Sequence, residues 1–490
     1  MRNLALLSLI GLSVACSTSD NKETAAEQDV FQQINTEVLE NSQAYSALKE
    51  SSETIGHRLT GSENGAKAEQ FIYDKLKSYG FEDVKFQEFE VEAWSRGTVD
   101  LKVAMDGKEQ EMPSVSLGHS PVEANVTAEV VDMGNGIATD YDNIRDKLKG
   151  KIALSFISLL PETPDSVSNL HRSEKAELAI KNGAVGVIIF NQVEGGVLLT
   201  GTASVTGELL DIPAICIGYE DGLKLKKQLA EKPGSVKATI NMTNNSGMIK
   251  ARNVIATLPG SELPNERVIV GGHLDSWDLA TGAIDNGIGS FAVLDIARTF
   301  KANNLNPKRT MQFAFFMGEE QGLFGSKHMV ELAEQDGSID NIKFMMNLDM
   351  SGNPVGMNVS GAAIDTTFFT SLGERIQQVD TVYQATFTSR AGLHSDHQPF
   401  MLAGVPIISV KSNLNPEIYK CYHADCDDFD LVDKEHITNT TRFATMMLYE
   451  IANADKLPAV KMNSEETRQF MIDNGLEENL KMQGDWKWGD

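Results

Sequence analysis

The chain has 490 residues, too many for one ordinary hydrophobic core, so we expect two or more domains. It carries 69 acidic and 43 basic residues, and the resulting net charge of −26 argues against partners such as nucleic acid or an anionic lipid surface. With 41% hydrophobic residues, the composition is that of a globular protein. None of these quantities indicates an oligomeric state.

The chain begins with a targeting segment. An apolar run at Leu4–Val14 follows a basic residue and leads to small residues, which predicts a signal peptide at residues 1–15. The run is too short to span a bilayer. Cleavage before Cys16 resembles a bacterial lipoprotein signal, so we expect an exported cell-envelope lipoprotein, periplasmic or on the outer membrane, held to the membrane through its lipid alone. An ordinary secretion signal, and so a secreted protein, is the alternative. Residues 16–29 are polar and predict a flexible tether.

Helical spacing dominates the next stretch. Apolar residues recur near one helical face in Phe31–Glu50, with Asn41 interrupting the series. A turn at Ile55–Gly61 precedes a second helical pattern in Ala66–Tyr79. Alternating residues at Lys85–Ala93 then predict a strand.

Residues 126–243 change character, since short apolar strands alternate there with helical patterns. The GKIA sequence at Gly150–Ala153, followed by a lysine- and alanine-rich helix and a GVIIF strand, resembles a protease-associated domain. This stretch contains no cluster of metal ligands or nucleophiles. We expect its lone His171 at the surface, and Cys216 as a buried thiol in an apolar strand.

In the second half, histidines and carboxylates follow predicted strands or open the next helix. In an open parallel α/β sheet, ligands gather at the carboxyl ends of the strands, so residues about 150 positions apart can converge. A mixed histidine and carboxylate set suits Zn²⁺, and five ligands suffice for two ions if one carboxylate bridges them. The candidates are His273, Asp285, Glu320, Asp349 and His423.

The motifs around these residues resemble the M28 family of co-catalytic dizinc peptidases. Their order and combination carry the resemblance, because no single piece is specific. The matching stretches are GGHLDSWD at Gly271–Asp278, GAIDNG at Gly282–Gly287, GEEQG at Gly318–Gly322, NLDMSG at Asn347–Gly352 and YHADCDD at Tyr422–Asp428.

The resemblance implies an α/β fold with a mixed, mostly parallel sheet sandwiched by helices, and an inserted smaller α/β protease-associated domain. The catalytic domain would then be divided by the insert. The expected bounds are 30–125 and 244–455 for its two parts, 126–243 for the insert and 456–490 for a polar tail, which packs as a short helix or stays loose.

The family also implies a role for each ligand. Asp285 would bridge two Zn²⁺ ions. His273 and Asp349 would complete the site of one ion, and Glu320 and His423 that of the other.

Two further residues would act in catalysis. By the same resemblance, Asp275 would hydrogen-bond His273 and fix its tautomer. Glu319 would be the general base that takes a proton from the water between the metals and passes it to the leaving amine.

Three classes of function compete. The first is a dizinc exopeptidase that cleaves near the N-terminus of peptides or in dipeptides; its carboxypeptidase Q-like variant needs a cation for the terminal carboxylate, for which Arg390 is a candidate. The second is a glutaminyl-cyclase-like acyltransferase with one zinc. The third is a non-catalytic, receptor-like protein, which the full ligand set disfavours.

Two details near the predicted site remain open. Cys421 and Cys426 flank His423, and a disulfide is favoured over a zinc knuckle because no second cysteine pair exists. Asp396 and His397 lie in a loop that resembles an active-site loop of the family. Either they contact substrate or support the metals, or they brace a turn through an Asp–His hydrogen bond.

Overall fold

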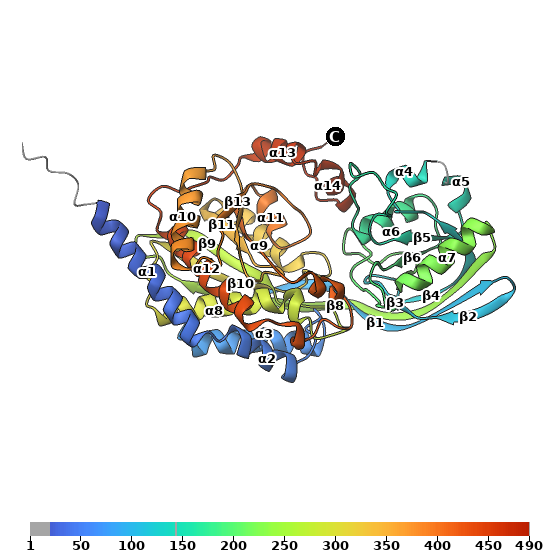
Figure 1. Ribbon diagram of the computed structural model, residues 1–490, viewed down its shortest axis with the longest axis horizontal. Coiled ribbons are helices and arrows are strands. Elements are labelled where there is room, and N and C mark those ends of the chain that lie inside the picture. The colour runs from blue at the N-terminus through green and yellow to red at the C-terminus, as the bar shows by residue number, and fades with distance from the viewer. Residues whose placement is uncertain (1–19, 143–144, 490) are drawn as a thin grey trace, which may run out of the picture.

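The computed structural model describes residues 20–142 and 145–489 (Figure 1). The first half of the chain forms three helices, a long strand, the insert and a second long strand. In order, these elements are α1 (Asp20–Asn41), α2 (Ala44–Thr54), α3 (Glu63–Ser78), β1 (Asp83–Met105), β2 (Lys108–Met112), β3 (Ser114–Ser116), β4 (Glu123–Asp132), α4 (Ala138–Tyr141), α5 (Arg145–Leu148), β5 (Ile152–Phe156), α6 (Arg172–Lys181), β6 (Gly186–Phe190), β7 (Ala214–Ile217), α7 (Tyr219–Glu231) and β8 (Val236–Leu258).

The second half alternates strands and helices. Its elements are β9 (Leu263–His273), α8 (Ile288–Ala302), β10 (Arg309–Phe316), α9 (Phe324–Gln335), β11 (Ile342–Asn347), β12 (Gly356–Ser360), α10 (Thr366–Val379), β13 (Thr386–Thr388), α11 (His397–Leu402), β14 (Ile407–Lys411), α12 (Lys434–Asn453), α13 (Ser464–Asp473) and α14 (Glu477–Gln483). The main sheet has the order β13-β12-β14-β11-β9-β10-β8, and β14, β11, β9 and β10 run parallel. The predicted fold class is confirmed.

Helices cover both faces of this sheet. Along β9, Val268 and Val270 belong to one hydrophobic core and Ile269 to another, because successive strand side chains point to opposite faces. The first core contains residues of α1, α2, α3, α8 and α12, whereas the second contains residues of α9, α11 and the C-terminal helices. The strands that precede the predicted ligands are parallel, so they end at the same edge of the sheet between the two helical layers, and the ligands are expected at that edge.

Helix α3 fixes the turn that precedes it. Its N-cap residue Ser62 accepts a hydrogen bond from the Gly65 N–H at 2.9 Å, and the chain leaves the helix through Gly80 at a φ of +85°. Ile72 and Leu76 are fully buried on its inner face. The turn at residues 55–61 is thereby held against the edge of the sheet.

Strands β1 and β8 form one antiparallel ribbon that extends from the main sheet into the insert (Figure 1). They pair from Asp83 opposite Thr257 to Met105 opposite Val236, so β1 is much longer than the predicted strand at 85–93. The SRG sequence at residues 95–97 hides this continuity by breaking the apolar alternation. A Cβ on Gly97 would lie 2.3 Å from the Thr243 carbonyl oxygen, so the ribbon requires glycine at that point.

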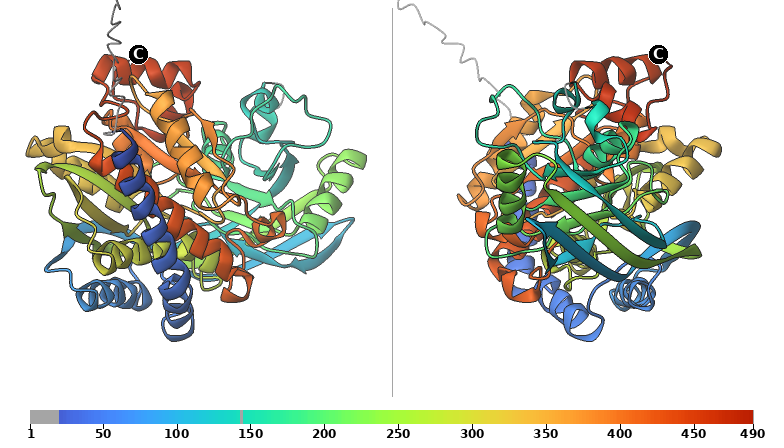
Figure 2. Two further views of the ribbon diagram at one scale, coloured as in Figure 1. Left: turned by 60° about the vertical axis from the view of Figure 1, so that its left-hand side comes forward. Right: turned by 90° about the vertical axis from the view of Figure 1, so that its right-hand side faces the viewer.

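The hydrophobic core of the insert also takes in residues ahead of residue 126. Leu101 and Val103 of β1 and Met112 of β2 pack in that core with Ile240 of β8, whereas Val91 of β1 packs in the first core. Strand β1 is therefore shared by both cores. The insert continues the sheet through β4, β5, β6, β7 and β3, with α6 and α7 packed against β6; the right-hand view of Figure 2 faces this part of the molecule.

The insert also makes polar contacts with the main sheet and its helices, which together form the predicted catalytic domain and are called the catalytic layer below. Arg96 pairs with both carboxylate oxygens of Asp278 at 3.1 and 2.9 Å and donates to Thr200 Oγ1 at 2.7 Å. The Thr200 N–H also donates to the His423 carbonyl oxygen at 2.8 Å. A loop of the insert therefore supports the backbone of a predicted metal ligand.

The start of the chain differs from its prediction. The tether expected at residues 16–29 is wrong from Asp20 onwards, because helix α1 begins there. Alanine, glutamate, glutamine and lysine dominate residues 22–28, and these residues have high helix propensity despite their polarity. The predicted signal peptide and Cys16 lie outside the described residues. Among the described helices, none is long and apolar enough to cross a membrane.

Candidate active site

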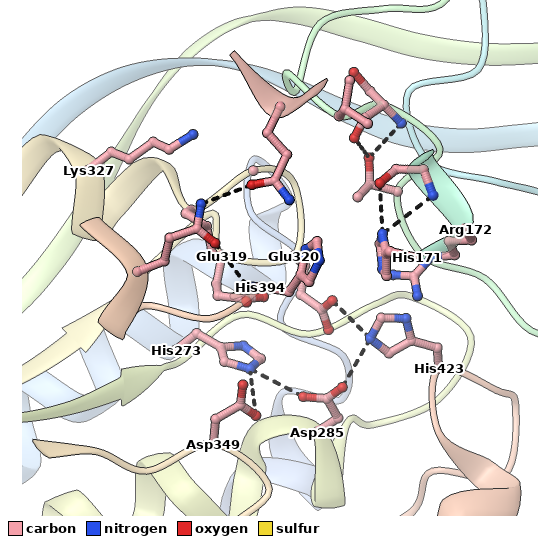
Figure 3. Close-up of a pocket in the computed structure, with 18 of the residues that line it drawn as sticks. His171, Arg172, His273, Asp285, Glu319, Glu320, Lys327, Asp349, His394 and His423 are labelled. Carbon is pink, nitrogen blue, oxygen red and sulfur yellow. Dashed lines mark hydrogen bonds and ion pairs between the residues drawn. The ribbon is translucent and has the colours of Figure 1, made fainter. Parts of the chain in front are cut away.

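The five predicted ligands meet at the carboxyl edge of the parallel strands (Figure 3). His273 is the last residue of β9, and Asp285 lies with a non-helical backbone in a kinked turn, Ala283–Gly287, that leads into α8. Glu320 and Asp349 follow β10 and β11 by four and two residues, and His423 lies in the loop after β14. Strand order alone brings these loops side by side, since β14, β11, β9 and β10 are neighbours.

Asp285 stands between the two imidazoles. Its Oδ1 lies 3.2 Å from His273 Nε2, and its Oδ2 lies 3.0 Å from His423 Nε2. His273 Nε2 is also 3.4 Å from Asp349 Oδ1, and His423 Nε2 is 3.1 Å from Glu320 Oε2. The result is two ligand trios that share one carboxylate.

This arrangement fits a pair of divalent cations. Nitrogen and oxygen atoms bound tetrahedrally to one Zn²⁺ at 2.0–2.2 Å lie roughly 3.3–3.5 Å apart, close to the separations within each trio. Glu320 Oε1 is buried and has no hydrogen-bond partner, which leaves an acceptor free for a cation. Whether these side chains bind metal stays a prediction.

The charges of the cluster also call for cations. Burial opposes protonation of His273, yet the carboxylates of Glu319, Asp349 and Asp285 raise its pKa well above the usual range. Burial likewise opposes protonation of His423, but Glu320 and Asp285 raise its pKa. Both imidazoles therefore lie among carboxylates whose negative charge favours a positive charge at this place.

Glu319 projects beside the same cluster, at the edge of the cavity. One of its carboxylate oxygens lies within 4.8 Å of ligand atoms of His273 and Asp349. Burial raises the pKa of Glu319 well above its usual range, and the charges of Glu320 and Asp349 add to this effect. Its backbone N–H donates to Asp275 Oδ1 at 3.3 Å, which orients the residue.

Asp275 departs from its predicted contact. The His273 Nδ1 atom pairs with the Asp275 backbone carbonyl oxygen at 3.1 Å, whereas the Asp275 carboxylate lies 3.8 Å away. The carbonyl accepts the Nδ1 proton and leaves Nε2 free, so the tautomer is fixed by backbone rather than side chain. The carboxylate instead accepts from Thr60 Oγ1 at 3.0 Å and from Glu319, and burial raises its pKa to about 6.

Two supporting residues come from segments whose role sequence reasoning missed. Arg58 is fully buried and donates to the carbonyl oxygens of Leu274, Thr281 and Gly282 at 2.6–2.8 Å. Asp427 accepts from the backbone N–H of Asp285 at 3.0 Å. The RLTG and CDD stretches around them were visible in the sequence, but only the fold shows that they hold the Asp285 loop.

The loop at residues 395–400 supports the site through a residue not singled out in advance. Ser395 Oγ donates to Asp349 Oδ2 and accepts from Asn347 Nδ2, each at 2.7 Å. Asp396 is fully buried and burial raises its pKa to about 7, while His397 Nε2 pairs with the Gly392 carbonyl oxygen at 3.0 Å. The predicted Asp–His brace is therefore not the contact that His397 makes.

A cavity of about 170 Å³ opens above the ligands. Three parts of the chain line it: the catalytic layer, the insert and the C-terminal tail. Besides the five ligands and Glu319, the lining includes His171, Arg172, Lys327, His394, Gln398, Tyr422, Gln483 and Asp485.

His171 lines the cavity, so its predicted place at the surface is wrong. It stacks on His394 of the catalytic layer with ring centroids 4.7 Å apart, and burial lowers its pKa well below the usual range. The next residue, Arg172, is 5% exposed, and its Nε has no hydrogen-bond partner. A Cβ on Gly201 would lie 2.0 Å from Arg172 Cζ, so glycine leaves room for the guanidinium. The insert thus contributes charge to the cavity.

Arg390 lies elsewhere. It is exposed and lines a neighbouring cavity of about 520 Å³, beside Gly392 and Ser409. Within the cavity above the ligands, the cationic side chains are those of Arg172 and Lys327.

The cysteines take the favoured arrangement. Cys421 and Cys426 form a disulfide across the loop that carries His423, and Cys216 is a buried free thiol. Trp277 packs edge-on against the His423 ring with ring centroids 6.2 Å apart, so this side chain is held by an aromatic contact as well as by the closed loop.

Comparison with known proteins agrees with this architecture. The pattern of peptidase family M28 matches residues 253–448, and that of the PA domain matches residues 126–225. Carboxypeptidase Q of Mus musculus is 26% identical over 415 residues, which are 83% of this chain and 84% of that protein. Aminopeptidase YwaD of Bacillus subtilis is 28% identical over 431 residues, 85% and 86% of the two chains.

Solved structures show the same fold. A peptidase M28 precursor from Shewanella amazonensis superposes with a TM-score of 0.76 at 23% identity, over 90% of this chain and 99% of that one. The aminopeptidase from Aneurinibacillus sp. strain AM-1 gives a TM-score of 0.65 at 26% identity, over 88% and 98%. The chain thus combines a segment that matches peptidase family M28 with a segment that matches the PA domain, and it is a metallopeptidase.

Proposed function

We propose that this protein is a dizinc exopeptidase that cleaves dipeptides or removes residues from the N-terminus of short peptides. The observation that carries the proposal is the Asp285 carboxylate, which lies 3.2 and 3.0 Å from the two imidazoles. One shared carboxylate and two separate trios are what a pair of adjacent ions requires.

Two Zn²⁺ ions held by these trios would act as Lewis acids toward the scissile carbonyl and the attacking water. Glu319 would take the proton of that water and deliver it to the leaving amine. Its carboxylate lines the cavity but is not a member of either trio around Asp285, so it would be free for this role. The Asp275 carboxylate would hold Glu319 in position by accepting the hydrogen bond of the Glu319 backbone N–H. The walls of the cavity would keep bulk water from the reacting atoms.

The cavity directly above the predicted ligands accommodates a small substrate. Its volume is about 170 Å³, and it adjoins a second cavity of about 520 Å³ that shares Asp349, Met350 and His394 in its lining. The names of its relatives include both an aminopeptidase and a carboxypeptidase. Dipeptidase activity would be compatible with both names, because a dipeptide presents both its terminal ammonium and its terminal carboxylate to the same cavity.

A metal count combined with a peptide panel tests this proposal. We expect two Zn²⁺ per chain by elemental analysis, and cleavage of free dipeptides in preference to N-blocked ones. Removal of the metal by a chelator should abolish cleavage, and added Zn²⁺ should restore it. One Zn²⁺ per chain with cyclisation of N-terminal glutamine would instead identify a glutaminyl-cyclase-like enzyme.

We also propose that the mature protein starts at Cys16 and is anchored to the bacterial cell envelope through a lipid on that residue. The support is the apolar run that ends at Ala15 and Cys16. Replacing the thiol in Cys16→Ser should move the protein from the membrane fraction to the soluble exported fraction. The buried Cys216→Ser is the matched control, for which we expect unchanged partition. Membrane association that survives Cys16→Ser would contradict the proposal.

A further inference from the structure

The C-terminal segment crosses from the catalytic layer to the insert. Leu480 of α14 is fully buried together with Met471 of α13, in the core that α9 and α11 also share. Helix α14 packs beside α6 of the insert, as Figure 1 shows. The predicted polar tail is therefore packed against both parts of the molecule, and Gln483 and Asp485 of this tail line the cavity.

One contact joins this segment to the insert. Asn479 Nδ2 donates to Glu174 Oε1 at 2.6 Å. The other oxygen of Glu174 accepts the backbone N–H of His171 at 2.8 Å. The C-terminal segment thereby fixes the start of α6, where His171 and Arg172 enter the cavity.

At the end of α14 and just after it, two side chains of the segment, those of Gln483 and Asp485, line the cavity itself. Gln398 Nε2 donates to Gln483 Oε1 at 3.1 Å and to Asp485 Oδ2 at 2.9 Å. Lys327 Nζ lies 3.3 Å from the other oxygen of Asp485. The Asp485 charge is thus balanced, and the amide oxygen of Gln483 is occupied.

The amide nitrogen of Gln483 is left free. The side chain is 8% exposed, and Nε2 has no hydrogen-bond partner. Its orientation follows from the network, since Gln398 Oε1 accepts the His394 N–H at 2.8 Å and so presents Nε2 as the donor to Gln483. A buried donor without an acceptor costs stability, and a ligand oxygen in the cavity removes that cost.

We propose that this segment, residues 476–488, limits the length of the substrate: it closes one side of the cavity, and Gln483 Nε2 donates a hydrogen bond to the terminal carboxylate of a dipeptide. The Arg172 guanidinium lines the same cavity, its Nε has no hydrogen-bond partner, and its charge favours an anionic group there. We call residues 476–488 the C-terminal wall. The inference rests on the proposed function, and it names the part of the chain that selects dipeptides over longer peptides.

Binding tests the hydrogen bond without requiring turnover. In a zinc-loaded Glu319→Ala background, the Kd of a free dipeptide is measured by calorimetry for three variants. Gln483→Glu keeps the shape and the oxygen that Gln398 needs but replaces the donor with an acceptor, so we expect Kd to rise about tenfold or more. Gln483→Ala should raise Kd about three- to tenfold. Gln469→Ala, an exposed glutamine of α13 that bonds Asp473, should change nothing.

Kinetics test the length limit. In the Gln483→Ala, Asp485→Ala double variant, we expect kcat/KM for a tetrapeptide relative to that for a dipeptide to rise about tenfold, because the wall is opened. The Gln483 variants should raise KM for the dipeptide while kcat stays within about twofold. Zinc content and melting temperature, measured for each variant, identify any loss of fold.

The outcomes separate the two proposals. An unchanged Kd in Gln483→Glu, or an unchanged length ratio in the double variant, overturns the role of the C-terminal wall and leaves the peptidase intact. Dipeptide binding that depends on Gln483 in a protein that cleaves no peptide supports the wall and overturns the proposed peptidase specificity.

Discussion

Glu319→Ala should lower the rate of peptide cleavage by about 10²–10⁴-fold while the zinc content stays near that of the unaltered protein. The side chain borders the cavity but is not one of the groups that contact Asp285 directly. Removing it therefore deletes the proton acceptor and spares the two trios. Turnover and elemental analysis of the same preparation provide the measurement.

The neighbouring substitution should behave in the opposite way. Glu320 Oε2 lies 3.1 Å from His423 Nε2, so Glu320→Ala removes one member of a trio and should lower zinc occupancy together with activity. Glu331→Ala, an exposed glutamate of α9, should alter neither quantity. Full activity in Glu319→Ala, or zinc loss in Glu319→Ala but not in Glu320→Ala, would reverse the assigned roles.

The largest loss of metal should follow from Asp285→Ala. This carboxylate belongs to both trios, so its removal weakens both sites, whereas any other ligand substitution weakens mainly one. We expect less than one zinc per chain and a loss of activity of about 10⁴-fold or more. The loss of metal affinity should exceed the roughly 10–100-fold typical of removing a group that only orients a ligand.

Titration of the metal-free proteins with Zn²⁺ gives the comparison. Asp427→Ala, which removes the acceptor for the Asp285 N–H, should lower affinity by about that smaller factor. The exposed Asp74→Ala should titrate as the unaltered protein does. An Asp285→Ala protein that still binds two equivalents of zinc with unchanged affinity would exclude a shared ligand.

The positions of the candidate ligands followed from local sequence. Each of His273, Glu320 and Asp349 ends or follows an apolar strand, and strand ends in a parallel sheet share one edge. Their convergence therefore needed only the strand pattern and the family motifs. The disulfide around His423 followed from cysteine count and spacing in the same way.

What the sequence concealed depends on tertiary contacts. His171 stands alone in the sequence of the insert, and only the packing of the insert against the catalytic layer brings it onto His394. The contact with His273 Nδ1 was assigned to the Asp275 carboxylate, but the backbone carbonyl of Asp275 makes it. Asp275 is only two residues after His273, and the chain folds back so that its carbonyl reaches the ring. In the polar tail, the few apolar residues that anchor it, such as Leu480, carry too weak a periodic signal to predict burial.

The ribbon of β1 and β8 determines how the protease-associated insert can move relative to the rest of the molecule. Two flexible linkers would let such a module swing, but here two paired 23-residue strands run from one hydrophobic core into the other, with one shift of register between Arg96 and Thr98. Val91 lies in one core and Leu101, ten residues further along the same strand, lies in the other. Rotation of the insert would have to bend a hydrogen-bonded pair of strands rather than a loop, so the two cores should move, and melt, as a single body.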